Sequence, residues 1–165
     1  MMKFVLMLAS AIVLTGCVVS VPGLTSHTDV PLELKGFRTG MPLSECPAGA
    51  VDATREGRLL TCVLPGGSLG GTAVKASAMV ALDGSIVTIR HALERPTGFS
   101  QPGVLRALTE KFGPPACGAS PSTWLWSNGN DQLQLQEIQG AVILLDTVKS
   151  HTIQSIKAKS GAKNL

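Results

Sequence analysis

The chain has 165 residues, of which 15% are charged, and it carries 14 basic against 11 acidic side chains. This near balance argues against nucleic acid as a partner, because nucleic-acid-binding domains usually carry a clear basic excess. The length suits one domain after removal of a leader, and 18 glycines and 10 prolines indicate a fold rich in turns.

The first residues have the pattern of a cleavable signal peptide. Lys3 precedes an apolar stretch of eleven residues, 4–14, which is too short to cross a hydrocarbon core of ~30 Å as a helix. The stretch ends in Leu-Thr-Gly-Cys at residues 14–17, which resembles the bacterial lipobox. The resemblance implies cleavage before Cys17 and attachment of diacylglycerol to its thiol. We therefore expect residues 1–16 to be a signal peptide.

A lipid-anchored chain of this kind belongs at a membrane surface. Each buried CH₂ of an acyl chain contributes about 0.8 kcal/mol, so two or more chains hold the protein firmly. Val18 follows the cysteine, and by resemblance to enteric lipoprotein sorting the lack of aspartate there favours the outer membrane. We expect a location on its periplasmic face or at the cell surface. Residues 17–31, punctuated by proline and glycine, are expected to form the lipidated N-terminus and a tether.

Three cysteines follow the lipobox, and thiols within reach tend to pair in an oxidising periplasm. Three cannot all pair within one chain. We predict a disulfide between Cys46 and Cys62, whose loop of about 16 residues would contribute roughly 3 kcal/mol. Cys117 is then left free, and a Cys62–Cys117 pair is the alternative. No metal or cofactor is expected, since there is no C-x-x-C and the histidines are far apart: His27, His91 and His151.

The first half of the domain reads as a short helix followed by strands. Pro42 suits the first position of a helix, which Pro47 limits to one or two turns, and a loop is expected at 48–57. Residues 58–64 form a predicted strand. The glycine-rich run 65–71 lacks the Lys-Ser/Thr of a phosphate-binding loop and reads as a flexible inter-strand loop.

The clearest hairpin flanks Asp83-Gly84, a strong two-residue turn signal, with strands at 72–82 and 85–94. A two-residue turn pairs Leu82 with Ser85 and predicts pairs in step along both strands, including Val80 with Val87, Ala78 with Ile89 and Val74 with Leu93. These pairs share a mostly apolar face, which we expect to be buried. His91 falls on that face and is expected to be partly buried.

The second half begins with the best helix of the chain. After a loop at 95–100, Ser100 is a candidate N-cap, and three apolar residues lie at helical spacing: Leu105, Leu108 and Phe112. Gly113 and two prolines end it. Strands are expected at 123–127, 132–137 and 141–145. Residues 150–165 read as a basic, partly disordered tail.

This order predicts a two-layer α+β domain over 32–149, with helices on one face of an antiparallel sheet. Gly-Met-Pro-Leu-Ser-Glu at 40–45 and Lys-Phe-Gly-Pro-Pro at 111–115 resemble the helix entry and exit of BamE/SmpA-like lipoproteins, or of the related β-lactamase-inhibitor proteins. Strands separate the two helices here, which favours the two-repeat layout of the second family, one helix per repeat. The resemblance implies a binding module.

We therefore expect a non-catalytic lipoprotein that binds another envelope protein through a sheet face or loops. Trp124 and Trp126 alternate with Leu125, so both rings project to one face of the sheet, either as an interaction surface or as core under the long helix. The alternative is an inhibitor or a phage superinfection-exclusion factor, which would act through a protruding loop at 65–71 or 95–100.

An enzymatic function finds little support in the spacing of the acidic residues. No Ser/His/Asp grouping and no close carboxylate pair is evident, and turn aspartates have structural roles. The candidate acids are Glu45, Asp83, Glu94, Asp131 and Asp146.

Overall fold

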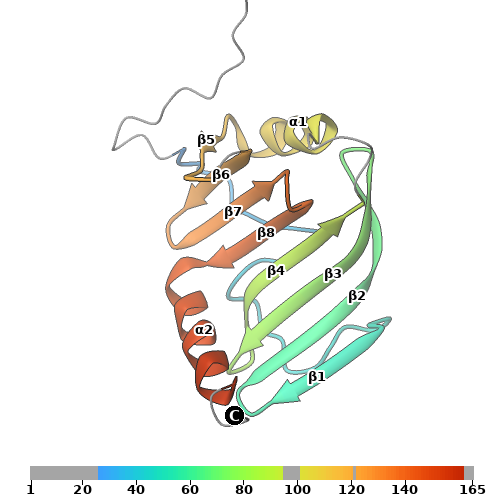
Figure 1. The fold of residues 1–165 in the computed structure, drawn as a ribbon, viewed down its shortest axis with the longest axis vertical. Coiled ribbons are helices and arrows are strands. Elements are labelled where there is room, and N and C mark those ends of the chain that lie inside the picture. Colours follow the sequence, from blue (N-terminus) through green and yellow to red (C-terminus); the bar gives the residue numbers. More distant parts are fainter. Residues whose placement is uncertain (1–25, 95–100, 121, 162–165) are drawn as a thin grey trace, which may run out of the picture.

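The computed structural model describes residues 26–94, 101–120 and 122–161. The predicted signal peptide, the lipidated cysteine and most of the tether lie outside these residues, as does the loop 95–100. A single eight-stranded antiparallel sheet dominates the described chain, with strand order β1-β2-β3-β4-β8-β7-β6-β5 (Figure 1). The elements are β1 (Asp52–Glu56), β2 (Leu59–Leu69), β3 (Thr72–Leu82), β4 (Ser85–Leu93), α1 (Pro102–Phe112), β5 (Ala116–Cys117), β6 (Thr123–Asn128), β7 (Asp131–Gln136), β8 (Ala141–Asp146) and α2 (Thr147–Gly161).

The sheet consists of two four-stranded meanders, β1–β4 and β5–β8, joined along their last strands. β4 pairs antiparallel with β8, from Thr88 opposite Leu145 to Ala92 opposite Ala141. Helix α1 lies between the two meanders in the sequence. The α+β class expected from the sequence is therefore confirmed at the level of an antiparallel sheet with helices.

The predicted short helix after Pro42 is wrong. The N–H groups of Gly40 and Leu43 donate to the carbonyls of Ile86 and Gly84, each at 2.7 Å, and Ile86 N–H donates to Met41 O at 2.9 Å. This segment is therefore extended along the β3–β4 turn, because the turn supplies hydrogen-bond partners that one helical turn between two prolines cannot. The loop expected at 48–57 also contains the edge strand β1, whose five residues are all exposed.

The glycine-rich run 65–71 is mostly strand rather than a protruding loop. β2 continues to Leu69, opposite Thr72, and the turn is made by Gly70 and Gly71, which both have positive φ. At Gly66 a Cβ atom would stand 1.8 Å from the Val74 carbonyl oxygen, so the neighbouring backbone leaves no room for a side chain. The glycines therefore serve backbone packing within the sheet.

The β3–β4 hairpin has the predicted turn and ends but a shifted middle. Leu82 pairs with Ser85 and Val74 with Leu93, as expected, whereas Val80 pairs with Thr88 and Met79 with Ile89. A bulge at Val87 shifts the register by one residue, and a second irregularity near Lys75 restores it. The hydrophobic pattern did not exclude this shift because both faces of the hairpin are largely apolar.

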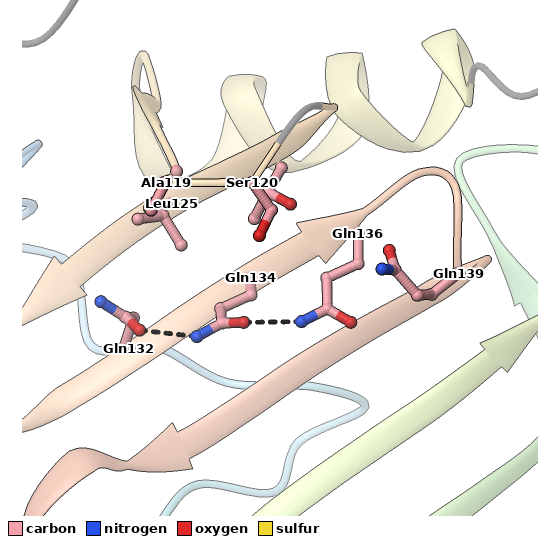
Figure 2. Close-up of a pocket in the computed structure, with 9 residues that line it drawn as sticks. Ala119, Ser120, Leu125, Gln132, Gln134, Gln136 and Gln139 are labelled. Carbon is pink, nitrogen blue, oxygen red and sulfur yellow. Dashed lines mark hydrogen bonds between the residues drawn. The ribbon is translucent and has the colours of Figure 1, made fainter.

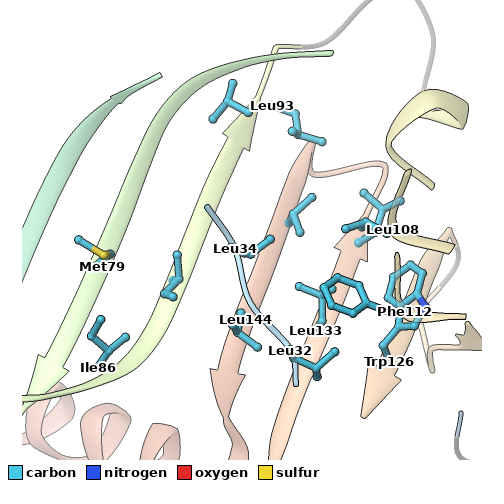
Figure 3. Packing of buried hydrophobic residues seen from close by; sticks show 14 of the residues in the cluster. Leu32, Leu34, Met79, Ile86, Leu93, Leu108, Phe112, Trp126, Leu133 and Leu144 are labelled. Atoms are coloured by element: carbon cyan, nitrogen blue, oxygen red, sulfur yellow. The ribbon is translucent and has the colours of Figure 1, made fainter. Parts of the chain in front are cut away.

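The main core lies on one side of the sheet, which we call the inner face (Figure 3). Extended segment 26–50 crosses it with Leu32 and Leu34, and α1 covers it with Val104, Leu108 and Phe112. The sheet residues packed there include Met79, Ile89, Trp126, Leu133 and Leu144.

Helix α2 packs on the opposite side, which we call the open face. Ile153 of α2 is buried against Leu59, Leu82 and Val87, with Ile156 beside it. The two helices therefore contact opposite faces, and the expected arrangement of both helices on one face is not found. Among the described residues, no helix is long and apolar enough to span a membrane.

Residues 150–161, which the sequence placed in a basic, partly disordered tail, belong to α2. The side chain of Asp146 accepts the N–H groups of Val148 and Lys149 at 3.0 and 2.9 Å and so caps the helix. Residues 162–165 lie outside the described part. The helix escaped prediction because only Ile153 and Ile156 mark its buried side, too few for a recognisable period.

Candidate functional site

The open face carries a row of three glutamine side chains on β7 (Figure 2). Strand alternation sends Leu133 and Leu135 into the core and leaves Gln132, Gln134 and Gln136 on the open face. The amide of Gln134 donates to Gln132 at 2.7 Å, and that of Gln136 donates to Gln134 at 2.8 Å. The amides therefore form a directional chain, with a donor amide at the Gln132 end and an acceptor carbonyl at the Gln136 end.

Two shallow hollows border this row. One, of about 270 Å³, lies between the glutamines and the β5–β6 connection and is lined in part by Gly118, Ala119 and Ser120. The other, of about 420 Å³, lies between the sheet and α2. Gln132 and Gln134 line both hollows, so the hollows adjoin along the glutamine row, and together we call them the depression.

The depression is almost free of charge. Strands β4, β8, β7 and β6 are fully described, and of their open-face positions only Arg90 is charged. The residues beside the glutamine row are mainly apolar and half-buried, notably Leu125, Ile143 and Leu145. Such a surface offers amide hydrogen bonds and apolar contact, and it offers no acid–base pair.

The two tryptophans belong to the core and do not form the predicted interaction surface. Trp126 is fully buried on the inner face, and its indole N–H donates to the Gly113 carbonyl at 2.8 Å. Trp124 is partly buried and packs against the same cluster. Trp126 therefore stands under the end of α1, and both rings belong to the core, as the core alternative requires.

The disulfide between Cys46 and Cys62 is confirmed, with a Cα–Cα separation of 5.5 Å. It joins the extended segment to β2 on the inner face. The alternative Cys62–Cys117 pair is therefore wrong. Cys117 is also disulfide-bonded, so the expected free thiol is wrong as well. Cys17, the remaining cysteine of the sequence, lies outside the described residues.

The candidate acids serve mainly structural contacts. Asp83 forms an ion pair with Arg58 beside the β3–β4 turn, and this contact lowers the pKa of Asp83. The sheet places Asp131 opposite Asp146, a neighbour pair that sequence spacing did not reveal. Asp131 accepts a hydrogen bond from Thr39, while Asp146 caps α2 and lies 3.6 Å from Lys149. Glu45 and Glu94 are exposed in other parts of the fold.

The histidines do not come together either. His91 is 2% exposed on the inner face opposite Ser77, and burial lowers its pKa to about 4, with Lys35 contributing. His27 and His151 are exposed. Within the described ranges, no group of His, Cys, Asp or Glu is arranged to hold a metal ion.

The arrangement thus defines an antiparallel α+β domain with one covered face and one partly open face, which over β4, β8, β7 and β6 carries no charge except Arg90. No protein-family model, curated protein or solved structure matches this chain.

Proposed function

We propose that this protein is a lipid-anchored, non-catalytic binding module of the bacterial envelope that holds a protein partner on its open face. The observation that carries the proposal is the depression along the glutamine row, whose two hollows are lined by no Asp, Glu, Lys or Arg. Antiparallel sheets can leave one face to solvent, but such a face usually carries charged residues. Here Arg90 stands alone among four strands, which favours a partner over plain solvation.

The chemistry of the face favours a protein over a glycan. Each glutamine amide supplies two donors and one acceptor, which match peptide groups and neutral side chains. Leu125, Ile143 and Leu145 add apolar contact beside the row. No aromatic ring stands at the open-face positions of β4, β8, β7 and β6, so sugar rings would find no stacking platform there.

Site-specific photocrosslinking in intact cells tests the open face. A photoreactive residue at position 134 should capture one envelope protein, whereas the same residue at exposed position 54 on β1 should not. Ile143→Arg should abolish the adduct, because it places an unpaired charge in the interface, and Thr54→Arg should leave it unchanged. Equal capture from both positions, or capture that survives Ile143→Arg in a folded protein, would exclude this face. A hydrolase or a phage protein as the captured partner would favour the inhibitor or exclusion role.

The proposed anchor has its own test. The sulfur of Cys17 cannot carry a lipid and also form a disulfide, so the chemical state of this one atom decides whether the anchor exists. Mass spectrometry of the mature protein should show a chain that begins at Cys17 and carries acyl groups. Cys17→Ser should remove the acyl mass and release the protein from membranes. A mature wild-type chain in which the sulfur of Cys17 is joined to Cys117 would contradict lipid attachment.

A further inference from the structure

The described chain begins at one edge of the sheet, and this position constrains how an anchored domain can stand on a membrane. Ser127 N–H donates to Ser26 O at 3.0 Å, and Thr28 N–H donates to Ser127 O at 2.9 Å. The hydroxyl of Ser26 donates to Pro114 O at 2.8 Å. Residue 26 is therefore fixed beside β6, next to the β5 edge and far from β1 (Figure 1).

The chain between the proposed anchor and this point is short. Nine residue steps separate Cys17 from Ser26, which in any conformation reach at most about 32 Å. Six strand spacings of about 4.8 Å separate β6 from β1, roughly 29 Å in all. A domain standing on its β1 edge would need this segment almost fully extended, whereas a domain standing on its β5 edge needs only a fraction of that reach.

The β5 edge also has the composition expected of a surface that meets a membrane. Residues 112–130 contain no charged side chain and form the longest such stretch after Cys17. Ala119, Ser120 and Ser122 are exposed at this edge. By contrast, β1 at the opposite edge exposes Asp52, Arg55 and Glu56. Placing uncharged residues against headgroups avoids the desolvation of ionised groups.

We propose that the β5 edge, residues 116–120 and 122–125, is the surface on which the anchored domain rests against neutral lipid headgroups. This inference rests on the proposed lipid anchor. In this orientation the strands stack away from the bilayer, and the open face stands upright with its glutamine row near the membrane. A partner seated at the same membrane can then reach the open face from the side.

Fluorescence quenching by doxyl-labelled lipid tests this orientation on the lipidated full chain in zwitterionic vesicles. A fluorescent amino acid at position 119 should be quenched several-fold more strongly than the same residue at position 54 on β1 or at position 90 on the open face. Strong quenching at position 90 would mean that the open face lies flat on lipid, and equal quenching at 119 and 54 would mean no fixed orientation. Either result overturns the proposal.

A charge placed at the edge gives a matched comparison. Ser122→Asp should reduce quenching at position 119 at least twofold, and Thr54→Asp should leave it unchanged, since both positions are exposed. Undiminished quenching in Ser122→Asp would contradict direct contact. Co-flotation with the vesicles separates the two proposals: a wild-type chain that carries no lipid and stays in solution refutes the anchor, whereas a floating chain without quenching at 119 refutes only the orientation.

Discussion

The imidazole of His91 and the hydroxyl of Ser77 face each other across β3 and β4 in the inner face, and their polar atoms have no hydrogen-bond partner in the structure. Such groups are costly to bury, and the cost rises further if the imidazole takes up a proton. His91 thus limits the stability of the fold in acid, and it is more deeply buried than the sequence pattern predicted.

Acid should therefore destabilise the protein through His91. Its pKa is about 4 in the folded chain and about 6.5 when exposed, so the folded state favours the neutral ring. The contribution of neutral His91 to the free energy of unfolding is fully present above pH 6.5. It is lost as the pH falls to about 4 and below, and the total loss is about 3 kcal/mol. Urea unfolding at pH 7.5 and pH 4 should show this loss in wild type and much less of it in His91→Leu. Exposed His151→Leu is the control and should keep the wild-type pH dependence.

At the scale of elements, β2 shows how local composition misleads. A run with glycines at 66, 67, 70 and 71 predicted a flexible loop, yet Pro65 and residues 67–69 of that run are paired with β3. The helix α2 shows the converse, since its sequence has little helical periodicity and its position depends on the Asp146 cap and on two isoleucines. In both cases long-range partners outweigh local preference.

A pair of glycine substitutions in β2 should separate backbone packing from chain flexibility. Gly66→Ala places a Cβ atom 1.8 Å from the Val74 carbonyl oxygen, so the β2–β3 ladder must shift, and we expect a loss of roughly 3 kcal/mol. Gly67→Ala meets only the mobile end of Lys35 and should cost under about 1 kcal/mol. Thermal unfolding of the two variants makes the comparison. Similar losses in both would show that the β2–β3 pairing does not require glycine at position 66.

At the scale of the whole molecule, the Cys46–Cys62 disulfide ties the extended segment to the sheet. That segment supplies Leu32, Leu34 and Leu43 to the core but has few strand contacts of its own. The cross-link therefore restricts a part of the chain that would otherwise leave the core at low cost.

Removal of this disulfide should destabilise the protein as a whole. A separation of 16 residues gives a chain-entropy contribution of about 3 kcal/mol. The free energy of unfolding of the double variant Cys46→Ser/Cys62→Ser, measured with urea, should be lower by that amount. Its amide hydrogens at Gly40 and Leu43 should exchange faster. An unchanged midpoint would mean that hydrogen bonds to the β3–β4 turn already hold the segment.

The sequence by itself determined the elements whose signals are local. Helix α1 with its glycine end, the Asp83-Gly84 turn and the alternation of β7 follow from short-range rules, and the Cys46–Cys62 pair follows from cysteine number and loop length. Only the tertiary structure decided the register in the middle of β3–β4, the strand pairing of the glycine run, the opposite placement of the two helices and the packing of both tryptophans into the core. These depend on which apolar side of the sheet each helix covers, and that choice is made by contacts between residues far apart in the chain.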